Sequence, residues 1–373
     1  MSVQLRSEIK SNNTLTLSLA QVSIPEPAED EIVIRVEAAP INPSDIGLLF
    51  GPAHMNASQL TGSTQQPVVT APVNEDSMAS VSSRIDQSMV AGNEGAGVVV
   101  AAGSSENAQA LLGKVVAAAG GGMYSQYRAL TVIQCMVMPD NVTPAQAASS
   151  FVNPLTALAM TETMRKEGHT ALVHTAAASN LGQMLNKVCL ADGIQLVNIV
   201  RSAQQVEILR DIGAQYIVNS SSDSFHKDLV SALLATGATL AFDAIGGGAL
   251  ANDILAAMES AANQSASDFS RYGSTIHKQV YMYGGLDKNT STLNRNYGMA
   301  WGIGGWLLTA FLQKSDTSKI NELQNRVAQE ILTTFESKYN NEISLSQAIH
   351  PETILQYGKQ TTGNKYLINP NKI

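Results

Sequence analysis

One βαβ unit limits what this chain can fold into more than any other feature. A short, mainly apolar run over 171–174 is typical of a buried parallel strand. A turn of small residues ending in Asn180-Leu181-Gly182 leads into a helix predicted at about 181–191, and a second apolar strand at 195–200 ends before Arg201. A strand-to-helix turn of this kind presents backbone N–H groups and a helix N-terminus to an anion.

The identity of Arg201 indicates which dinucleotide the unit would bind. Folds that bind NAD usually place Asp or Glu at this position, whereas a cation favours the 2′-phosphate of NADP. The turn departs from the usual glycine pattern, because Thr175, Ala177 and Asn180 stand near the expected glycines. The alternative to dinucleotide binding is therefore a purely structural strand and helix joined by small residues. For Arg201, the alternative to a phosphate-binding role is a solvated arginine at the start of a helix.

The composition favours a well-buried α/β protein. At 373 residues the chain is long enough for two domains, and 44% hydrophobic against 14% charged residues excludes disorder. A net charge of −8, with no Lys/Arg run longer than two, argues against nucleic-acid binding. Cys135 and Cys189 lie far apart in apolar surroundings and predict buried thiols in a reducing compartment.

We expect a cytoplasmic protein that does not cross a membrane. The N-terminus lacks the apolar core of a signal peptide. The uncharged segment 296–313 is barely long enough to span a bilayer and contains four glycines, so a buried or subunit-interface segment is the preferred interpretation.

Periodicity divides the chain into a strand-rich, barrel-like N-terminal part and an α/β part. Half-buried or short strands are predicted from their alternation at about 15–19, 32–36, 97–102, 114–119, 124–129 and 133–138. Five parallel strands with crossover helices are predicted near 171–174, 195–200, 215–218, 238–244 and 279–283. Two segments, 54–90 and 263–278, have weak periodicity and are expected to be irregular insertions, either lids or mobile segments.

The order of four motifs resembles the medium-chain dehydrogenase/reductase superfamily. The motifs are the segment 31–45 ending in Ile41-Asn-Pro-Ser-Asp, Gly92-Asn-Glu-Gly-Ala-Gly, Asn153-Pro-Leu-Thr-Ala, and the βαβ turn. More narrowly, the chain is similar to the zinc-free branch of NADPH:quinone oxidoreductases and 2-enoyl thioester reductases. The resemblance implies a GroES-like catalytic domain at 1–140, a Rossmann NADP-binding domain with a doubly wound parallel sheet at 141–307, and a segment 308–373 that returns to the catalytic domain.

The resemblance also decides the expected metal content. In zinc-dependent members, the positions of Asn42 and Asn93 hold a cysteine and a histidine ligand, which neutral amides do not replace. We therefore expect no metal, and a structural hydrogen bond rather than base chemistry from Glu94. The implied reaction is zinc-independent hydride transfer from NADPH to a quinone-like or α,β-unsaturated carbonyl acceptor, whose π-system spreads the developing charge.

Family roles carried over by position give the candidate site. The resemblance places Asn42 and Ser44 beside the nicotinamide, and the alternative for Ser44 is a helix N-cap. Candidate cofactor-binding residues are Asn153, Thr156, Ser179, Asn180, Leu181, Gly182, Arg201, Gly285, Leu286, Asn364 and Lys365. The alternatives are N-capping around Pro154 for the first two, and a plain strand-end turn for Gly284-Gly285-Leu286.

One departure concerns the proton donor. Enoyl thioester reductases place a tyrosine where this chain has Ala53 or His54. Alanine donates no proton, and His54 could act as an acid or be a solvated loop histidine. A 2-enoyl thioester reductase and a non-catalytic NADPH-binding protein therefore stay as alternatives to a quinone-like reductase.

The segment 298–308 predicts the assembly. Members of the family pair an edge strand here with that of a second subunit, so we expect a homodimer, with Trp306 as a further wall of the substrate pocket.

Overall fold

The computed structural model describes residues 1–268 and 270–372. Phe269, inside the predicted 263–278 insertion, and Ile373 lie outside the described residues. The chain forms two compact units: unit 1 is Met1–Val152 with Gln324–Ile373, and unit 2 is Asn153–Leu323. The predicted α/β class, with a doubly wound parallel sheet and a strand-rich part, is confirmed. The domain boundaries at 140/141 and 307/308 stay predictions.

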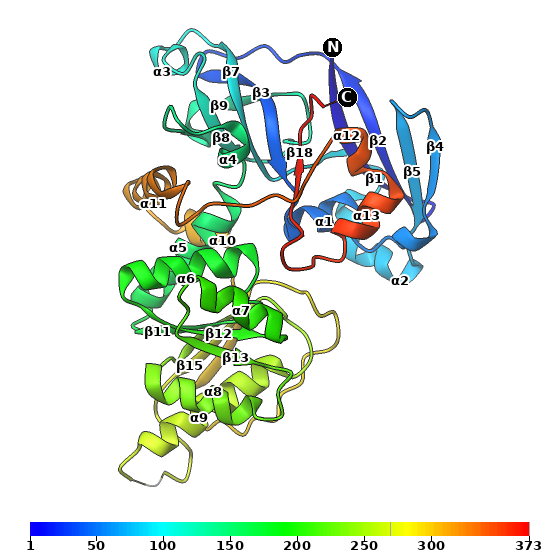
Figure 1. The fold of residues 1–373 in the computed structure, drawn as a ribbon. Helices are drawn as coiled ribbons and strands as arrows, with labels where there is room; N and C mark the ends of the chain where they lie inside the picture. Colours follow the sequence, from blue (N-terminus) through cyan, green and yellow to red (C-terminus); the bar gives the residue numbers. More distant parts are fainter. Residues whose placement is uncertain (269, 373) are drawn as a thin grey trace. The chain divides into compact units, whose positions relative to one another are not determined.

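Unit 2 is built on a parallel sheet with the order β13-β12-β11-β14-β15-β16. Its strands are β11 Ala171–His174, β12 Gln195–Val200, β13 Tyr216–Asn219, β14 Leu240–Asp243, β15 Lys278–Met282 and β16 Trp301–Gly305. The helices that begin in this part of the chain are α5 Val152–Lys166, α6 Asn180–Asp192, α7 Ala203–Asp211, α8 Phe225–Thr236, α9 Leu250–Ser265, α10 Leu308–Gln313 and α11 Thr317–Glu330. In Figure 1, α6 lies on one side of the strands, and α8 and α9 lie on the other.

Burial on both faces explains why the central strands are apolar runs. Val173, Val197 and Val218 pack against α8 and α9, whereas Ile217, the neighbour of Val218, packs with residues of α7. A strand covered on both sides by crossover helices needs apolar residues at successive positions. The apolar runs at 171–174 and 195–200 therefore match β11 and β12 residue for residue.

The sheet has one more strand than periodicity predicts, and this strand is the edge strand that the family resemblance implies within 298–308. Five parallel strands are expected, but in the described part of the chain β16 pairs in parallel with β15 and makes a sixth. Its sequence, Trp-Gly-Ile-Gly-Gly, lacks a regular apolar pattern because it forms the edge of the sheet. Segment 296–313 is thus divided between β16 and α10. Among the described residues, no helix is both long and apolar enough to cross a membrane.

Unit 1 contains two strand-rich sheets. The first has the order β4-β5-β2-β1-β6, and the second has β10-β8-β7-β3-β18-β17 with β9 paired to β3. The strands are β1 Ser2–Lys10, β2 Thr14–Val22, β3 Glu31–Pro40, β4 Gln59–Gly62, β5 Pro67–Pro72, β6 Met89–Val90, β7 Glu94–Ala102, β8 Val115–Ala119, β9 Tyr127–Thr131, β10 Cys135–Val137, β17 Asn341–Ile343 and β18 Tyr366–Ile368. The short helices are α1 Pro43–Leu49, α2 Glu75–Met78, α3 Glu106–Gln109, α4 Pro144–Ala147, α12 Leu345–Ala348 and α13 Pro351–Tyr357, with 3₁₀ turns at Met55–Ala57, Ala79–Arg84 and Val132–Gln134.

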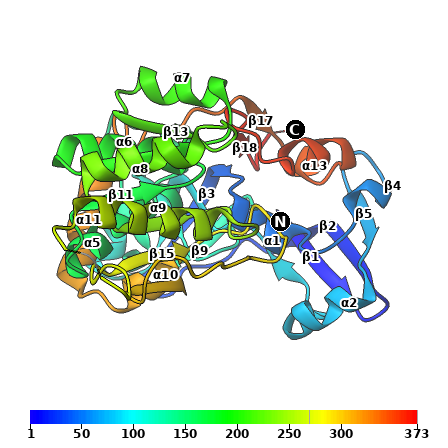
Figure 2. The same cartoon turned by 90° about the horizontal axis from the view of Figure 1, so that it is seen from below.

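Segment 54–90 is not irregular, contrary to the expectation from its weak periodicity. β4 and β5 form a hairpin that extends the sheet of β1 and β2 (Figure 2). Val69 and Ala71 point into the core of unit 1, and the segment is fixed there by burial. The strand was hidden because Pro67 and Pro72 bound it, and proline is usually a strand breaker except at strand ends.

Two further strand predictions need correction. The strand expected at 124–129 begins three residues later, as β9 Tyr127–Thr131, because Tyr124 is held in a buried turn before it. The strand β1 was not predicted at all, although Leu5 and Ile9 are fully buried.

Candidate functional site

In unit 1, one buried carboxylate joins two segments that are distant in the sequence. Asn42 precedes the first turn of α1, and its backbone N–H donates to Asp45 Oδ2 at 2.9 Å. The backbone N–H of Asn93 donates to Asp45 Oδ1 at 2.8 Å. Asp45 is fully buried, so its two oxygens hold both segments in a fixed position without competition from water.

A second buried carboxylate lies beside the first. Glu94 Oε1 accepts a hydrogen bond from Asn42 Nδ2 at 2.8 Å. Glu94 Oε2 accepts from the backbone N–H groups of Phe151 and Val152, at 2.8 and 2.9 Å, and so caps the start of α5. All of these partners are structural hydrogen bonds, as the sequence predicts for Glu94.

Ionisation of this cluster is perturbed by burial. Burial raises the pKa of Asp45 to about 7, against the opposing effect of its two backbone hydrogen bonds. Burial also raises the pKa of Glu94, although the charge of Lys365 opposes this. Burial lowers the pKa of Lys365 to about 8, and the carboxylates of Glu94 and Asp45 limit the decrease. Burial thus shifts the pKa of each of the three groups toward neutral pH.

Lys365, near the C-terminal end of the chain, is held by residues that are distant in the sequence. Its Nζ donates to Ser149 Oγ at 2.8 Å and lies 5.6 Å from the centre of the Tyr339 ring. Tyr339 also donates its hydroxyl to Ser149 Oγ, at 2.9 Å. The neighbouring Asn364 accepts a hydrogen bond from Asn341 at 3.1 Å, which ties the approach to β18. Ser149 and Tyr339 were missed by the sequence, because neither belongs to a motif.

The candidate catalytic residues of unit 1 divide into two groups. Ser44 Oγ accepts a hydrogen bond from Asn93 Nδ2 at 3.0 Å, and Asn42 reaches Glu94, so both belong to the carboxylate cluster. Asn42 Oδ1 is buried without a hydrogen-bond partner among the described residues. His54 is exposed at the start of a 3₁₀ turn, and no described residue hydrogen-bonds its ring.

In unit 2, the turn between β11 and α6 has an anion-binding form. Ser179 is the N-cap of α6, and its hydroxyl accepts from the N–H of Gly182 at 3.1 Å. Leu181 donates its N–H to no described residue, so this donor is available to a ligand. A Cβ on Gly182 would lie 2.2 Å from the carbonyl oxygen of Ala177, so only glycine fits there.

The departure from the glycine pattern has a structural cost. Ala176 has a φ of 49°, a left-handed conformation for which glycine is usual. The strain is about 1 kcal/mol for an alanine. The neighbouring Thr175 donates to Asp243 Oδ1 at 2.7 Å and accepts from the N–H of Ala244 at 2.8 Å, which links the carboxyl ends of β11 and β14.

Arg201 follows β12 and is exposed, and its guanidinium contacts no partner among the described residues. Its backbone is well fixed. The N–H donates to Gln205 Oε1 at 3.0 Å, and the carbonyl accepts from Ser221 Oγ at 2.9 Å. Ser202 caps α7. A fixed backbone with an open cation is suited to bind a phosphate group.

The loop after β15 packs against the loop after β14. The N–H of Leu286 donates to the carbonyl of Ala244 at 3.2 Å, and a Cβ on Gly284 would lie 2.5 Å from the same oxygen. A Cβ on Gly285 would meet no described atom within 4 Å, and the Leu286 side chain is 47% exposed. The two loops therefore lie together at the carboxyl edge of the sheet, where ligands bind in folds of this kind.

The last two candidates lie in the first turns of α5. Asn153 and Thr156 are inside this helix, which begins at Val152, so neither is its N-cap. Thr156 is buried, and Asn153 is half-buried.

Sequence reasoning missed a buried pair at the same edge of the sheet. His174 Nε2 lies 2.7 Å from the hydroxyl of Tyr283, and its Nδ1 is buried without a partner among the described residues. Burial lowers the pKa of His174 to about 3, so the ring is neutral. A histidine ending an apolar strand was the available signal.

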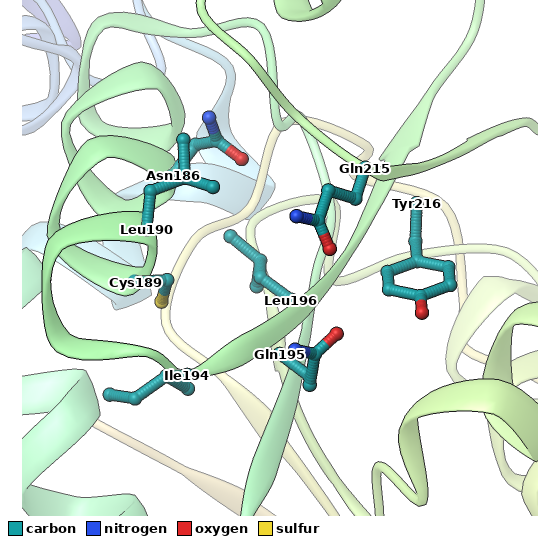
Figure 3. Close-up of a pocket in the computed structure, with 8 residues that line it drawn as sticks. All are labelled: Asn186, Cys189, Leu190, Ile194, Gln195, Leu196, Gln215 and Tyr216. Carbon is teal, nitrogen blue, oxygen red and sulfur yellow. The ribbon is translucent and has the colours of Figure 1, made fainter.

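A shallow pocket of unit 2 lies away from all of these residues (Figure 3). It has an empty volume of about 220 Å³, which includes space open to solvent. Its lining residues come from the end of α6 and the amino ends of β12 and β13: Asn186, Cys189, Leu190, Ile194, Gln195, Leu196, Gln215 and Tyr216. The predicted turn and Arg201 are at the carboxyl ends of the strands, so this pocket is not the predicted site.

No group of three or more His, Cys, Asp or Glu side chains among the described residues is arranged to hold a metal ion. Asn42 and Asn93 instead direct their amide nitrogens to Glu94 and Ser44.

Comparison with known proteins finds relatives in sequence over about half of the chain and similar solved structures over nearly all of it. No family model matches the chain. A mitochondrial enoyl-[acyl-carrier-protein] reductase of Xenopus tropicalis is 30% identical over 210 residues, which are 54% of this chain and 51% of the relative. The chain spans about half the length of most curated relatives that it matches.

Solved structures are similar over nearly the whole chain. A putative NADPH:quinone reductase from Mesorhizobium loti has a TM-score of 0.72 at 24% identity, covering 99% of this chain and 98% of that one. The Escherichia coli quinone oxidoreductase complexed with NADPH has a TM-score of 0.69 at 18% identity, covering 99% of this chain and 100% of that one. At these identities the likeness establishes the fold.

Proposed function

We propose that this chain, which has the two-domain fold of the medium-chain dehydrogenase/reductase superfamily, is a zinc-independent, NADPH-dependent oxidoreductase. The observation that carries the proposal is the pairing of the β11–α6 turn with Arg201 at the end of the next strand. Two relatives in fold or sequence, a quinone oxidoreductase and an enoyl reductase, are named for reductions of this kind.

The residues of unit 2 fit the diphosphate and 2′-phosphate of NADP. The open N–H of Leu181 and the N-terminus of α6 supply donors for the pyrophosphate. The unpartnered guanidinium of Arg201 supplies the charge for the 2′-phosphate. No Asp or Glu follows β12 to bind a ribose 2′-hydroxyl, which is why NADP is preferred to NAD.

For the reacting end of the cofactor, the family resemblance implies polar residues that belong to unit 1. The cofactor, when bound, supplies a hydride. Ser44 offers a hydroxyl, which accepts a hydrogen bond from Asn93, and Asn42 offers a buried, unpartnered carbonyl oxygen, with its amide nitrogen held by Glu94. Lys365 adds a cation beside these groups. A neutral donor such as the Ser44 hydroxyl is sufficient when the acceptor is conjugated, because its π-system spreads the charge that hydride transfer creates.

Quinone-like and enone acceptors are therefore the proposed substrates. A 2-enoyl thioester reductase is the second candidate, favoured by the Xenopus relative at 30% identity. His54 is then the proposed acid, because it is exposed and stands where the tyrosine donor is expected.

Cofactor preference is tested by replacing Arg201. We expect Arg201→Ala to weaken NADPH binding by about 10–100-fold, since hydrogen bonds to charged groups contribute about 1.5–3 kcal/mol, and to leave NADH binding nearly unchanged. Arg210→Ala, on the exposed face of α7, is the matched control. Titration of NADPH and NADH fluorescence measures both constants. An equal loss for both cofactors would remove Arg201 from the site.

Activity is tested by anaerobic stopped-flow oxidation of NADPH with a panel of quinones, enals and enoyl thioesters. Rapid oxidation by quinones or enals supports the first candidate. Thioester turnover that is lost in His54→Gln, with cofactor binding intact, supports the second. Tight NADPH binding with no turnover on any acceptor would identify a non-catalytic binding protein instead.

The assembly and the compartment belong to the same proposal. β16 is an edge strand that pairs only with β15 among the described residues, and Met299 and Leu307 beside it are 79% and 61% exposed. We expect a homodimer through this edge, with Trp306 near the substrate pocket, and sedimentation velocity tests the dimer. A cytoplasmic location stays a prediction, and several relatives are named as mitochondrial, so cell fractionation should compare both compartments.

A further inference from the structure

The family resemblance places Asn93 where zinc-dependent members of the superfamily have a histidine ligand, and in this chain its side chain hydrogen-bonds Ser44. It precedes β7 and follows Gly92, whose φ of 93° and lack of a Cβ allow the chain to turn against Tyr124. The backbone N–H of Asn93 donates to buried Asp45, which fixes the residue at its main chain. Its side-chain amide then meets Ser44, 49 positions away in the sequence, at 3.0 Å.

The direction of this hydrogen bond determines what Ser44 can do. Asn93 Nδ2 is the donor and Ser44 Oγ is the acceptor. A serine hydroxyl has one hydrogen, so the O–H of Ser44 is left to donate to another group. Ser44 is exposed, and no second partner of its hydroxyl occurs among the described residues. The hydroxyl therefore keeps a hydrogen that no described residue accepts.

We propose that Asn93 is a positioning residue that directs the Ser44 hydroxyl toward the carbonyl oxygen of the acceptor substrate. The inference rests on the proposed function, and it names the group that stabilises the reduced substrate. NADPH, when bound, would supply a hydride to the β-carbon of an enone, and the π-electrons would then move to the carbonyl oxygen. Ser44 donates a hydrogen bond to that oxygen, and a proton from solvent completes the saturated product.

The buried carboxylates explain why an amide is suited to this position. An amide is neutral, so it adds no charge beside Asp45 and Glu94, the pKa values of which burial already raises. It also offers a fixed N–H to Ser44, which a carboxylate at the same position lacks. An ionised aspartate there would accept the Ser44 hydrogen and turn the hydroxyl away from the substrate.

Asn93→Asp is therefore the informative variant, because it keeps the shape and reverses the hydrogen bond. We expect kcat with an enal or quinone to fall about 100-fold, the usual effect of losing one oxyanion donor, with the NADPH dissociation constant and KM little changed. The variant's activity should rise again as the pH is lowered, because the introduced carboxyl can donate to Ser44 once it is protonated. The wild type should not show this gain.

A double-mutant comparison separates positioning from general damage. Ser44→Ala should lose as much activity as Asn93→Asp, and the double variant should lose no more than either alone. Asn93→Ala adds no charge and serves if Asn93→Asp fails to fold, as judged by circular dichroism. It should reduce kcat about 10-fold, because the hydroxyl is retained but no longer oriented, and it should have no effect in the Ser44→Ala background.

The measurements distinguish a failure of the role of Asn93 from a failure of the proposed oxidoreductase function. Wild-type kcat in Asn93→Asp, or losses that add in the double variant, would overturn the role of Asn93 and leave the proposed function intact. A wild-type protein that oxidises NADPH with none of the acceptors would overturn the proposed function and this inference with it.

Discussion

The buried ion pair of unit 2 gives the sharpest quantitative prediction of the structure. Lys278 is 0% and Glu259 5% exposed, and Lys278 Nζ donates to Glu259 Oε2 at 2.6 Å. The same nitrogen donates to Ser274 Oγ at 2.9 Å and to the carbonyl of Ile276 at 3.0 Å. The pair thereby ties α9 to the start of β15 and to the segment between them.

Lys278→Met removes the cation and leaves a buried carboxylate. Breaking a buried pair from one side costs about 3–5 kcal/mol. Glu259 keeps hydrogen bonds from the Ser274 backbone, its hydroxyl and Asn263, which places the expected loss near the lower end, about 3 kcal/mol. For a unit of this size, the midpoint of thermal unfolding should fall by about 6–12 °C.

Tryptophan fluorescence reports this loss selectively. The chain has two tryptophans, Trp301 and Trp306, and both lie in unit 2. Urea unfolding followed by their emission therefore measures the unit that contains the ion pair. Lys227→Met, at an exposed position of α8, is the control and should change stability by less than about 0.5 kcal/mol.

If the loss of stability comes from the unpaired charge of Glu259, two further results are expected. The double variant Lys278→Met/Glu259→Gln should regain more than half of the lost stability, since no buried charge is left unpaired. The deficit of Lys278→Met should also shrink as the pH falls, because an unpaired Glu259 can take up a proton. In the wild type, the hydrogen bonds from Lys278 and Ser274 outweigh burial and hold the pKa of Glu259 below its usual range. A loss under about 1 kcal/mol in the single variant, or an equal loss in the double variant, would refute the reasoning.

Two other substitutions test the site in the same way. Gly182→Ala should weaken NADPH binding more than 10-fold and destabilise unit 2 by about 1–3 kcal/mol, because its Cβ would lie 2.2 Å from the Ala177 oxygen. Gly285→Ala is the control and should leave stability unchanged, because its Cβ would meet open space. Similar unfolding midpoints for the two variants would contradict the packing argument. Burial raises the pKa of Asp45 from 3.8 to about 7, so the folded protein holds this proton more tightly than the unfolded chain and loses stability as the pH rises from 4 to 7. The wild type should therefore become less stable relative to Asp45→Asn over that range, by up to about 4 kcal/mol, and a calorimetric difference that does not vary with pH would oppose this.

The sequence predicted the parts of the fold that depend on local patterns. β11 and β12 are recognisable because nearly every residue in them is buried, and the helices of unit 2 follow from their spacing. The hairpin of β4 and β5 was not predictable in this way. β4 is exposed throughout, and β5 joins the sheet through its pairing with β2, some 50 residues earlier.

The sequence suggested individual candidate residues, but it did not indicate the hydrogen bonds that connect them. Motif positions gave Asn42, Ser44 and Arg201, of which Ser44 and Arg201 are exposed and Asn42 is buried. The sequence could not show that Asp45 binds Asn93, or that Lys365 reaches Ser149 across 216 positions. Such partners depend on the register of distant strands, which local patterns do not encode.

A crystal structure with NADP⁺ bound tests the central claim most directly. The account predicts that the 2′-phosphate contacts the Arg201 guanidinium and that the pyrophosphate accepts from the N–H of Leu181. Adenosine phosphates bound elsewhere on the chain, or a turn between β11 and α6 left vacant at saturating NADP⁺, would contradict it.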